Sequence, residues 1–177
     1  MKKIAIVICL ILCFFLIYFL QINIFSSFTI AGISPNLFVI YILFIGLFGN
    51  QILGISFGVI IGLIIDFIYG KTIGPTAIML CIVGFLGSYF DKNFSKENKF
   101  TIMVMVAGST IIFELGHYFL NSILLEFSRE FLYFFKIVAV ETLYNVLLTI
   151  ILYPLIQKIG YIIDRNFKHN NILTRYF

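Results

Sequence analysis

Long apolar runs separated by short polar breaks make up almost the whole of this chain. Residues 4–25, for example, contain no charged side chain, and about 20 apolar residues are enough for a helix to cross a bilayer. Of the 177 residues, 62% are hydrophobic and only 11% are charged, whereas a soluble domain carries about 25% charged residues. Because so few polar side chains cannot cover a water-facing exterior, the sequence predicts an all-α integral membrane protein.

The polar breaks predict six transmembrane helices in a single domain over residues 1–160, followed by a basic cytoplasmic tail over residues 161–177. The predicted spans are residues 4–25, 36–49, 52–69, 73–90, 100–125 and 131–157. The apolar run 37–69 is interrupted only by the Gly-Asn-Gln segment at 49–51. Since this run is too long for one span and slightly short for two, we expect two short helices there.

The distribution of Lys and Arg supports six spans with both termini in the cytoplasm. Nine basic residues then lie on the side of the N-terminus and three on the other side, in agreement with the positive-inside rule. The nine are Lys2, Lys3, Lys92, Lys96, Lys99, Lys158, Arg165, Lys168 and Arg175, and the three are Lys71, Arg129 and Lys136. A single span over 37–69 would invert this asymmetry, so charge as well as length favours two helices.

The sequence lacks the motifs of several other classes of protein. Its start resembles a signal peptide, but the apolar run is too long and no A-x-A-like cleavage site follows, so we expect it to remain as the first span. Cys9 and Cys13 lie one turn apart without the His or Asp of a metal site, and we expect no metal or cofactor. No phosphate loop, Ser–His–Asp pattern or nucleic-acid motif is found, so we expect neither an enzyme nor a nucleic-acid-binding protein.

The predicted tail, residues 161–177, mixes basic residues with Ile, Phe, Leu and Tyr. Two interpretations are open. The tail lies on the inner leaflet as an interfacial segment bound to anionic lipid, or it is a short solvated tail.

Glycines recur every four residues in the third predicted span. The spacing runs through Gly54, Gly58 and Gly62, and continues at Gly70 and Gly74 beyond the helix end. Helices in lipid associate by close packing, and small residues four apart let two backbones approach. The first three glycines therefore predict a groove, either for another helix of the same chain or for a transmembrane helix of a partner protein. Gly70 and Gly74 are expected to shape the outer turn.

Asp66 occupies the one place in this series where a glycine is missing. An ionisable residue inside a transmembrane helix is a functional-site hypothesis by default. Near the outer end of its helix, Asp66 could alternatively reach outer water or cap the following helix.

Three predicted helices carry polar groups at matching depths in the membrane. They are Asp66, Glu114, His117, Asn121, Lys136, Glu141 and Asn145. Such groups are costly facing lipid and should point inward, which predicts one internal cluster or a cavity facing the outer half. Two deep Glu carboxylates lying close together would not both be charged. The cluster is interpreted either as a satisfied network that sets helix register or as a proton relay or solute site.

A resemblance to a known family follows from two motifs. Ser34-Pro35-Asn36-Leu37 opens the second predicted span, and the pattern G-x3-G-x3-G-x3-D-x3-G-x3-G extends from Gly54 to Gly74. Together with about six spans and basic cytoplasmic ends, these motifs resemble the bacterial rod shape-determining protein MreD family. The resemblance covers roughly residues 30–90 by motif and the second half by hydropathy alone.

The resemblance implies a non-enzymatic, multi-pass subunit of the cell-elongation complex in the bacterial cytoplasmic (inner) membrane. This subunit would scaffold or regulate peptidoglycan synthesis through its direct partner MreC, with MreB, RodA and a penicillin-binding transpeptidase in the wider complex. The resemblance also implies a six-helix bundle similar to the substrate-binding S-components of energy-coupling-factor vitamin transporters. Such an S-component is the alternative function, because a polar cluster in the outer half would suit a solute.

Overall fold

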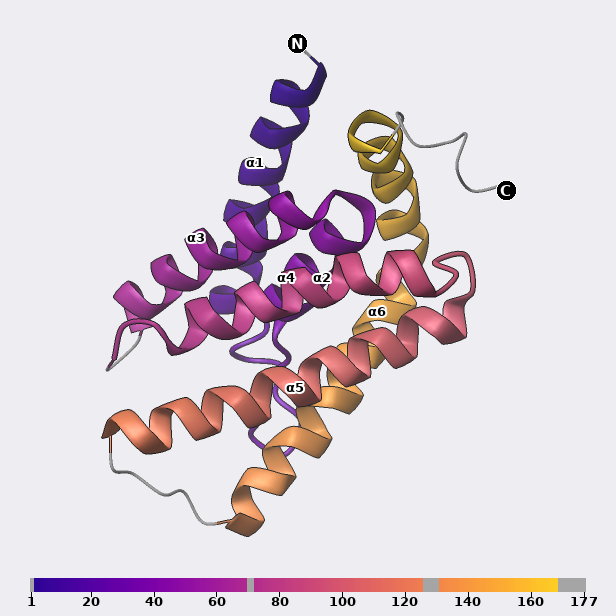
Figure 1. Cartoon of the computed structure of the whole chain (residues 1–177). Coiled ribbons are helices and arrows are strands. Elements are labelled where there is room, and N and C mark those ends of the chain that lie inside the picture. Colours follow the sequence, from indigo (N-terminus) through magenta and orange to yellow (C-terminus); the bar gives the residue numbers. More distant parts are fainter. Residues whose placement is uncertain (1, 70–71, 126–130, 169–177) are drawn as a thin grey trace.

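A computed structural model describes residues 2–69, 72–125 and 131–168 of the chain. This part of the chain forms six helices: α1 (Lys2–Asn23), α2 (Leu37–Phe48), α3 (Gln51–Tyr69), α4 (Pro75–Asn93), α5 (Lys99–Leu125) and α6 (Phe131–Phe167) (Figure 1). Among them α1, α3, α5 and α6 are long and apolar enough to cross a membrane. The prediction of an all-α membrane bundle is therefore confirmed. Gly70, Lys71, Arg129 and residues 169–177 of the predicted tail lie outside the described residues.

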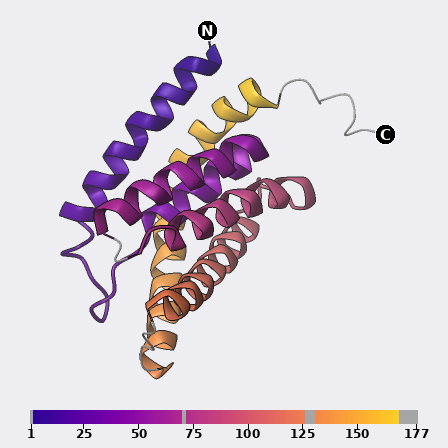
Figure 2. The same cartoon turned by 60° about the vertical axis from the view of Figure 1, so that its left-hand side comes forward.

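Helix α2 is short and central. Its 12 residues extend about 18 Å at 1.5 Å per residue, which is less than the hydrocarbon thickness of about 30 Å. All of its residues except Tyr41 are buried, and it contacts each of the other five helices. Figure 2 shows α2 enclosed between the other helices. Its near-uniform apolar sequence fits this position, because a helix that is hydrophobic on all sides is buried.

Polar side chains from other helices meet the backbone at the N-terminus of α2. Asn36 caps the helix and accepts a hydrogen bond from the Val39 N–H (3.3 Å). The Asn36 N–H donates to Oδ1 of Asn145 (2.8 Å), and the Leu37 N–H donates to Oε1 of Gln21 (3.1 Å). The first N–H groups of a helix have no intrahelical partner, so these contacts remove the cost of burying them.

The C-terminus of α2 is satisfied in the same way. The Ser88 hydroxyl on α4 donates to the Gly46 carbonyl (3.0 Å), and the Lys168 ammonium donates to the Leu47 carbonyl (2.6 Å). The last carbonyls of a helix also lack intrahelical partners, and a cation there interacts favourably with the helix dipole. A helix too short to reach water by itself is thereby supplied with partners at both ends.

The glycine row of α3 faces α4 of the same chain. A Cβ on Gly54 would lie 2.7 Å from the Gly84 carbonyl oxygen, and a Cβ on Gly58 would lie 2.7 Å from the carbonyl carbon of Leu80. On Gly62 it would lie 2.7 Å from the Ala77 nitrogen. Of the two interpretations left open by the sequence, the structure therefore shows packing inside the bundle, and α4 already covers this surface.

A second close approach joins α4 to α2. A Cβ on Gly87 would lie 2.9 Å from the Leu47 nitrogen, and a Cβ on Gly46 would lie 3.2 Å from the Cα of Gly87. The small residues Gly84 and Ser88 belong to this same part of α4. Helix α4 is thus in backbone contact with both α3 and α2. The three helices form one tightly packed unit.

Helix α6 ends at Phe167, ten residues beyond the predicted span that ended at residue 157. Gly160 gives the reason for part of this extension, because its Cα packs on the buried Phe48 ring and leaves no room for a Cβ. Asp164 and Lys168 give the rest. They form an ionic cluster with Asp91 and Lys96, in which the N–O distances are 2.8–3.4 Å.

Burial and charge act in opposite directions on this ionic cluster. Burial by itself would raise the pKa of Asp91, but hydrogen bonds and charge from Lys168 and Lys96 outweigh it and lower the pKa. Burial would lower the pKa of Lys96, but the hydrogen bonds that its ammonium donates to Asp164 and Asp91 outweigh this effect and raise the pKa. For Lys168 burial dominates, and its pKa is lowered despite the contact with Asp91.

Acid should weaken the ionic cluster through Asp91. Its folded-state pKa lies below the ordinary value of 3.8, so its ion pairs stabilise the fold above about pH 4 and are lost as the pH falls through the lowered pKa. The Tm of the purified protein in detergent should therefore fall on acidification below about pH 4. Asp91→Asn should show a smaller fall, and an equal fall in both proteins would contradict this role of Asp91.

Adding one methyl group to the α3–α4 contact should destabilise the bundle. Gly58→Ala places a Cβ against the backbone of Leu80 and Cys81, and overpacking of this kind costs about 1–3 kcal/mol. Gly108→Ala on α5 is the matched control, since a Cβ there meets nothing within 4 Å. Thermal unfolding in detergent should show a lower Tm for Gly58→Ala and an unchanged or higher Tm for Gly108→Ala. Equal values would disprove the close contact.

Candidate functional site

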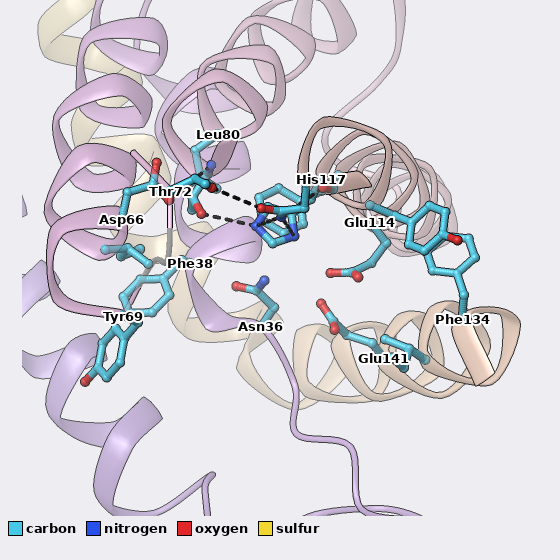
Figure 3. A pocket seen from close by; sticks show the side chains of 16 residues that line it. Asn36, Phe38, Asp66, Tyr69, Thr72, Leu80, Glu114, His117, Phe134 and Glu141 are labelled. Carbon is cyan, nitrogen blue, oxygen red and sulfur yellow. Dashed lines mark hydrogen bonds between the residues drawn. The ribbon is translucent and has the colours of Figure 1, made fainter. Parts of the chain in front are cut away.

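A cavity of about 650 Å³ lies between the C-terminal end of α3, the N-terminal half of α4 and the facing ends of α5 and α6 (Figure 3). Its lining residues are Asn36, Phe38, Ile65, Asp66, Tyr69, Thr72, Thr76, Leu80, Phe113, Glu114, His117, Tyr118, Asn121, Phe134, Ile137 and Glu141. The ionic cluster lies at the other ends of α4 and α6. Cavity and ionic cluster therefore occupy opposite ends of the bundle.

Asp66 lines this cavity but its carboxylate is bound to the backbone of α4. Oδ2 accepts hydrogen bonds from the N–H groups of Gly74 (2.8 Å) and Ala77 (3.2 Å), and Oδ1 accepts one from Thr76 (3.3 Å). The side chain is 3% exposed. The structure thus places Asp66 as the cap of the following helix, one of the roles that the sequence left open.

The position of Asp66 in the glycine series explains this role. Residues four apart lie on one face of a helix, so Asp66 continues the face on which Gly62 packs against Ala77. Helix α4 begins at Pro75, so the face of α3 meets unpaired N–H groups at the next turn. A carboxylate there accepts these hydrogen bonds and interacts favourably with the positive end of the helix dipole.

The turn before α4 has the geometry expected of its glycine. Gly74 has a φ of +121°, which lies in the region that favours glycine. It is the N-cap residue of α4, and its N–H is held by Asp66. Gly70, the other glycine assigned to this turn, lies outside the described residues.

His117 and Asn121 on α5 connect to the start of α4. The Thr76 hydroxyl lies 3.4 Å from Nε2 of His117, and the Thr72 hydroxyl donates to Oδ1 of Asn121 (3.2 Å). The Asn121 amide lies 3.1 Å from the same His117 nitrogen. The imidazole stacks on the Phe113 ring, with centroids 5.6 Å apart and an interplanar angle of 8°. Figure 3 shows the imidazole beside the cap of α4.

Glu114 and Glu141 face one another across the cavity from α5 and α6. Figure 3 shows both carboxyl groups directed into the space between the two helices, with the Asn36 side chain nearby. Glu141 is 7% exposed, and its Oε1 atom has no hydrogen-bond partner within the described residues. Both carboxyls therefore belong to the lining of the cavity.

The structure separates two of the seven polar residues from this cavity. Asn145 is fully buried next to it, where its amide donates to the Thr110 hydroxyl (3.1 Å) and its oxygen accepts from the Asn36 N–H. Lys136 is exposed, and its ammonium lies 6.0 Å from the centroid of the Tyr133 ring. Asn145 thus links helices, while the charge of Lys136 points away from the cavity lining.

Sequence reasoning did not assign several residues of the site. Thr72 and Thr76 lie at the start of α4, and their hydroxyl groups belong to the site. Asn36 also lines the cavity, whereas the sequence indicates it only as part of the start of the second span. Their spacing offers a signal, since Thr72 and Thr76 stand four apart around Gly74-Pro75. Gly46 and Gly87 were also missed, because neither belongs to a four-residue series of glycines.

The comparisons with known proteins give one match. Residues 2–161 match the family model described as rod shape-determining protein MreD. No curated protein and no solved structure matches the chain. The expected similarity to the S-components of vitamin transporters therefore stays a prediction.

Removing the cap should destabilise the start of α4. Asp66→Ala leaves three backbone N–H groups without their acceptor, at a cost of about 1–3 kcal/mol. Asp66→Asn keeps one acceptor oxygen and should cost less. Asn93→Ala is the control, because that side chain is exposed and donates to Tyr89 of its own helix. Unfolding in detergent should rank wild type and Asn93→Ala above Asp66→Asn, and Asp66→Ala lowest; wild-type stability of Asp66→Ala would refute the capping role.

Proposed function

The chain belongs to the MreD family of rod shape-determining proteins, and on this premise we propose that it is a non-enzymatic subunit of the cell-elongation complex that binds MreC directly. In this role it scaffolds or regulates peptidoglycan synthesis through MreC. MreB, RodA and a penicillin-binding transpeptidase belong to the wider complex. The observation that carries the proposal is the family match, which extends over residues 2–161 and therefore includes at least part of every helix.

The proposed orientation places both termini in the cytoplasm. Three parts of the chain meet at one end of the bundle, since the Lys3 ammonium lies 5.8 Å from the centroid of the Phe167 ring and Lys96 pairs with Asp164. This end contains the N-terminal part of α1, the α4–α5 connection and the C-terminal part of α6. Most Lys and Arg residues of the chain belong to these segments, which favours the cytoplasmic side for them.

The surface that binds MreC is expected to lie away from the glycine row. Gly54, Gly58 and Gly62 are covered by α4, so a partner helix would have to displace a helix of the bundle to reach them. We therefore expect that Gly58→Ala protein that remains folded still binds MreC.

Affinity purification tests the proposed partner. The tagged full-length chain, solubilised from membranes in mild detergent, should recover MreC, and its depletion should convert rod-shaped cells to round ones. An unrelated tagged multi-pass membrane protein is the control for non-specific recovery. Recovery of a bound vitamin and of transporter ATPases, without MreC, would overturn the proposal in favour of an S-component.

A further inference from the structure

Two acidic side chains that the proposed function does not use meet between α5 and α6. Glu114 on α5 and Glu141 on α6 are hydrogen-bonded to each other, and Glu141 is 7% exposed. Figure 3 shows the two carboxyl groups facing one another in the wall of the cavity. An ionised carboxylate accepts hydrogen bonds but cannot donate one. A hydrogen bond between two carboxyls therefore requires a proton on one of them.

The side chain of Asn36 indicates how many protons the pair holds. Its Oδ1 atom accepts a hydrogen bond from the Val39 N–H (3.3 Å), so its amide NH2 group is the donor in the hydrogen bond with Glu141. Asn36 is also the N-cap of α2, where the helix dipole favours a negative charge. Donor and dipole together stabilise one carboxylate, which leaves one proton for the pair as a whole.

The surroundings of the pair oppose the loss of this proton. The described residues that line the cavity include neither Lys nor Arg, and those from α2 and α4 include no titratable group. Lys136 on α6 is exposed. The other titratable groups of the lining are Asp66 and Tyr69 on α3 and His117 and Tyr118 on α5. Among these only His117 can become cationic, and its ring lies within hydrogen-bonding distance of Thr76 and Asn121. Because like charges in close contact disfavour one another, a second carboxylate without a fixed cation beside it is costly.

The pair joins three helices at the N-terminus of α2. Glu114 belongs to α5 and Glu141 to α6, while Asn36 precedes α2 and donates its N–H to Oδ1 of Asn145 on α6 (2.8 Å). Loss of the proton would remove the hydrogen bond between α5 and α6 and replace it by the repulsion of two carboxylates. The cavity of about 650 Å³ includes both side chains in its lining, and it is large enough for water that exchanges the proton.

We propose that Glu114 and Glu141 form a proton-binding site that holds α5 against α6 while one proton is shared between the two carboxyls. Release of this proton to water at alkaline pH leaves two carboxylates, which loosens the contact between the two helices beside the cavity. The inference does not rest on the proposed partnership with MreC, because it concerns the isolated chain and its own residues.

Infrared spectroscopy of the purified full-length chain, in a detergent without ester groups, tests for the proton itself. A protonated carboxyl has a C=O stretching band that a carboxylate lacks. At neutral pH the wild-type chain should show this band at the intensity of one carboxyl per chain, and the double variant Glu114→Gln/Glu141→Gln should lose it. Glu97→Gln is the control and should keep the band, since Glu97 is exposed in the α4–α5 connection and does not line the cavity. No band in the wild type, or an undiminished band in the double variant, would overturn the proposal.

Isotope labelling of the wild-type chain decides the assignment if the double variant does not fold. Glutamate labelled with ¹³C at the side-chain carboxyl lowers the frequency of a glutamic acid band and leaves an aspartic acid band unchanged. The band of the labelled chain should therefore shift to lower frequency. An unshifted band would assign the proton to an aspartate such as Asp66 and would refute the shared proton.

Glu114→Gln tests whether the proton holds α5 against α6, because its amide can donate to Glu141 at every pH and releases no proton. The folded wild-type pair retains a proton that the unfolded chain releases to water, so wild-type stability falls as the pH rises. Between about pH 7 and about pH 10, the Tm in detergent should fall about 2–4 °C further in the wild type than in Glu114→Gln. Glu97→Gln should follow the wild type. An equal fall in the wild type and in Glu114→Gln would contradict the proposal.

Discussion

The direct contact between the backbones of α3 and α4 is the interaction on which the rest of the bundle depends. In lipid, burial of apolar surface does not favour helix pairing, so helices associate by close packing. Gly54, Gly58 and Gly62 remove the side chains that would hold α4 away, and Gly46 and Gly87 do the same where α4 meets α2. Figure 1 shows the resulting unit, with α3 and α4 side by side over the enclosed α2.

This contact also sets the register that creates the site. Because Gly62 packs against Ala77, the next turn of α3 places Asp66 at the N-terminus of α4. The cap fixes the turn that carries Thr72 and Thr76, which in turn contact His117 and Asn121 on α5. The polar residues of three helices therefore meet at one end as a consequence of how two apolar helices pack.

The two ends of the bundle have different chemistry. At one end, Asp91, Lys96, Asp164 and Lys168 neutralise one another and hold the α4–α5 connection against α6 and α2. At the other end, the carboxyls of Glu114 and Glu141 line a cavity whose described lining includes His117 but neither Lys nor Arg. As a member of the MreD family, the chain is a membrane protein of the rod-shape complex. The cavity is an additional property of this chain, and residues of α2, α3 and α4 form part of its lining.

Composition and the length of the apolar runs were enough to predict an all-α membrane bundle and the existence of its helices, because lipid allows few alternatives to a helix. The motifs around Pro35 and Gly54–Gly74 were enough for the family. The sequence could not tell what the glycine row contacts, since a small-residue face has the same spacing whether its neighbour is in the same chain or a partner. It also could not show that α6 continues beyond residue 157, because the contacts of Asp164 and Lys168 come from α2, α4 and the α4–α5 connection. Likewise, matching depths along three helices grouped Lys136 with Glu141, and only the tertiary structure separated them, because the rotation of each helix about its axis decides which side chains face inward.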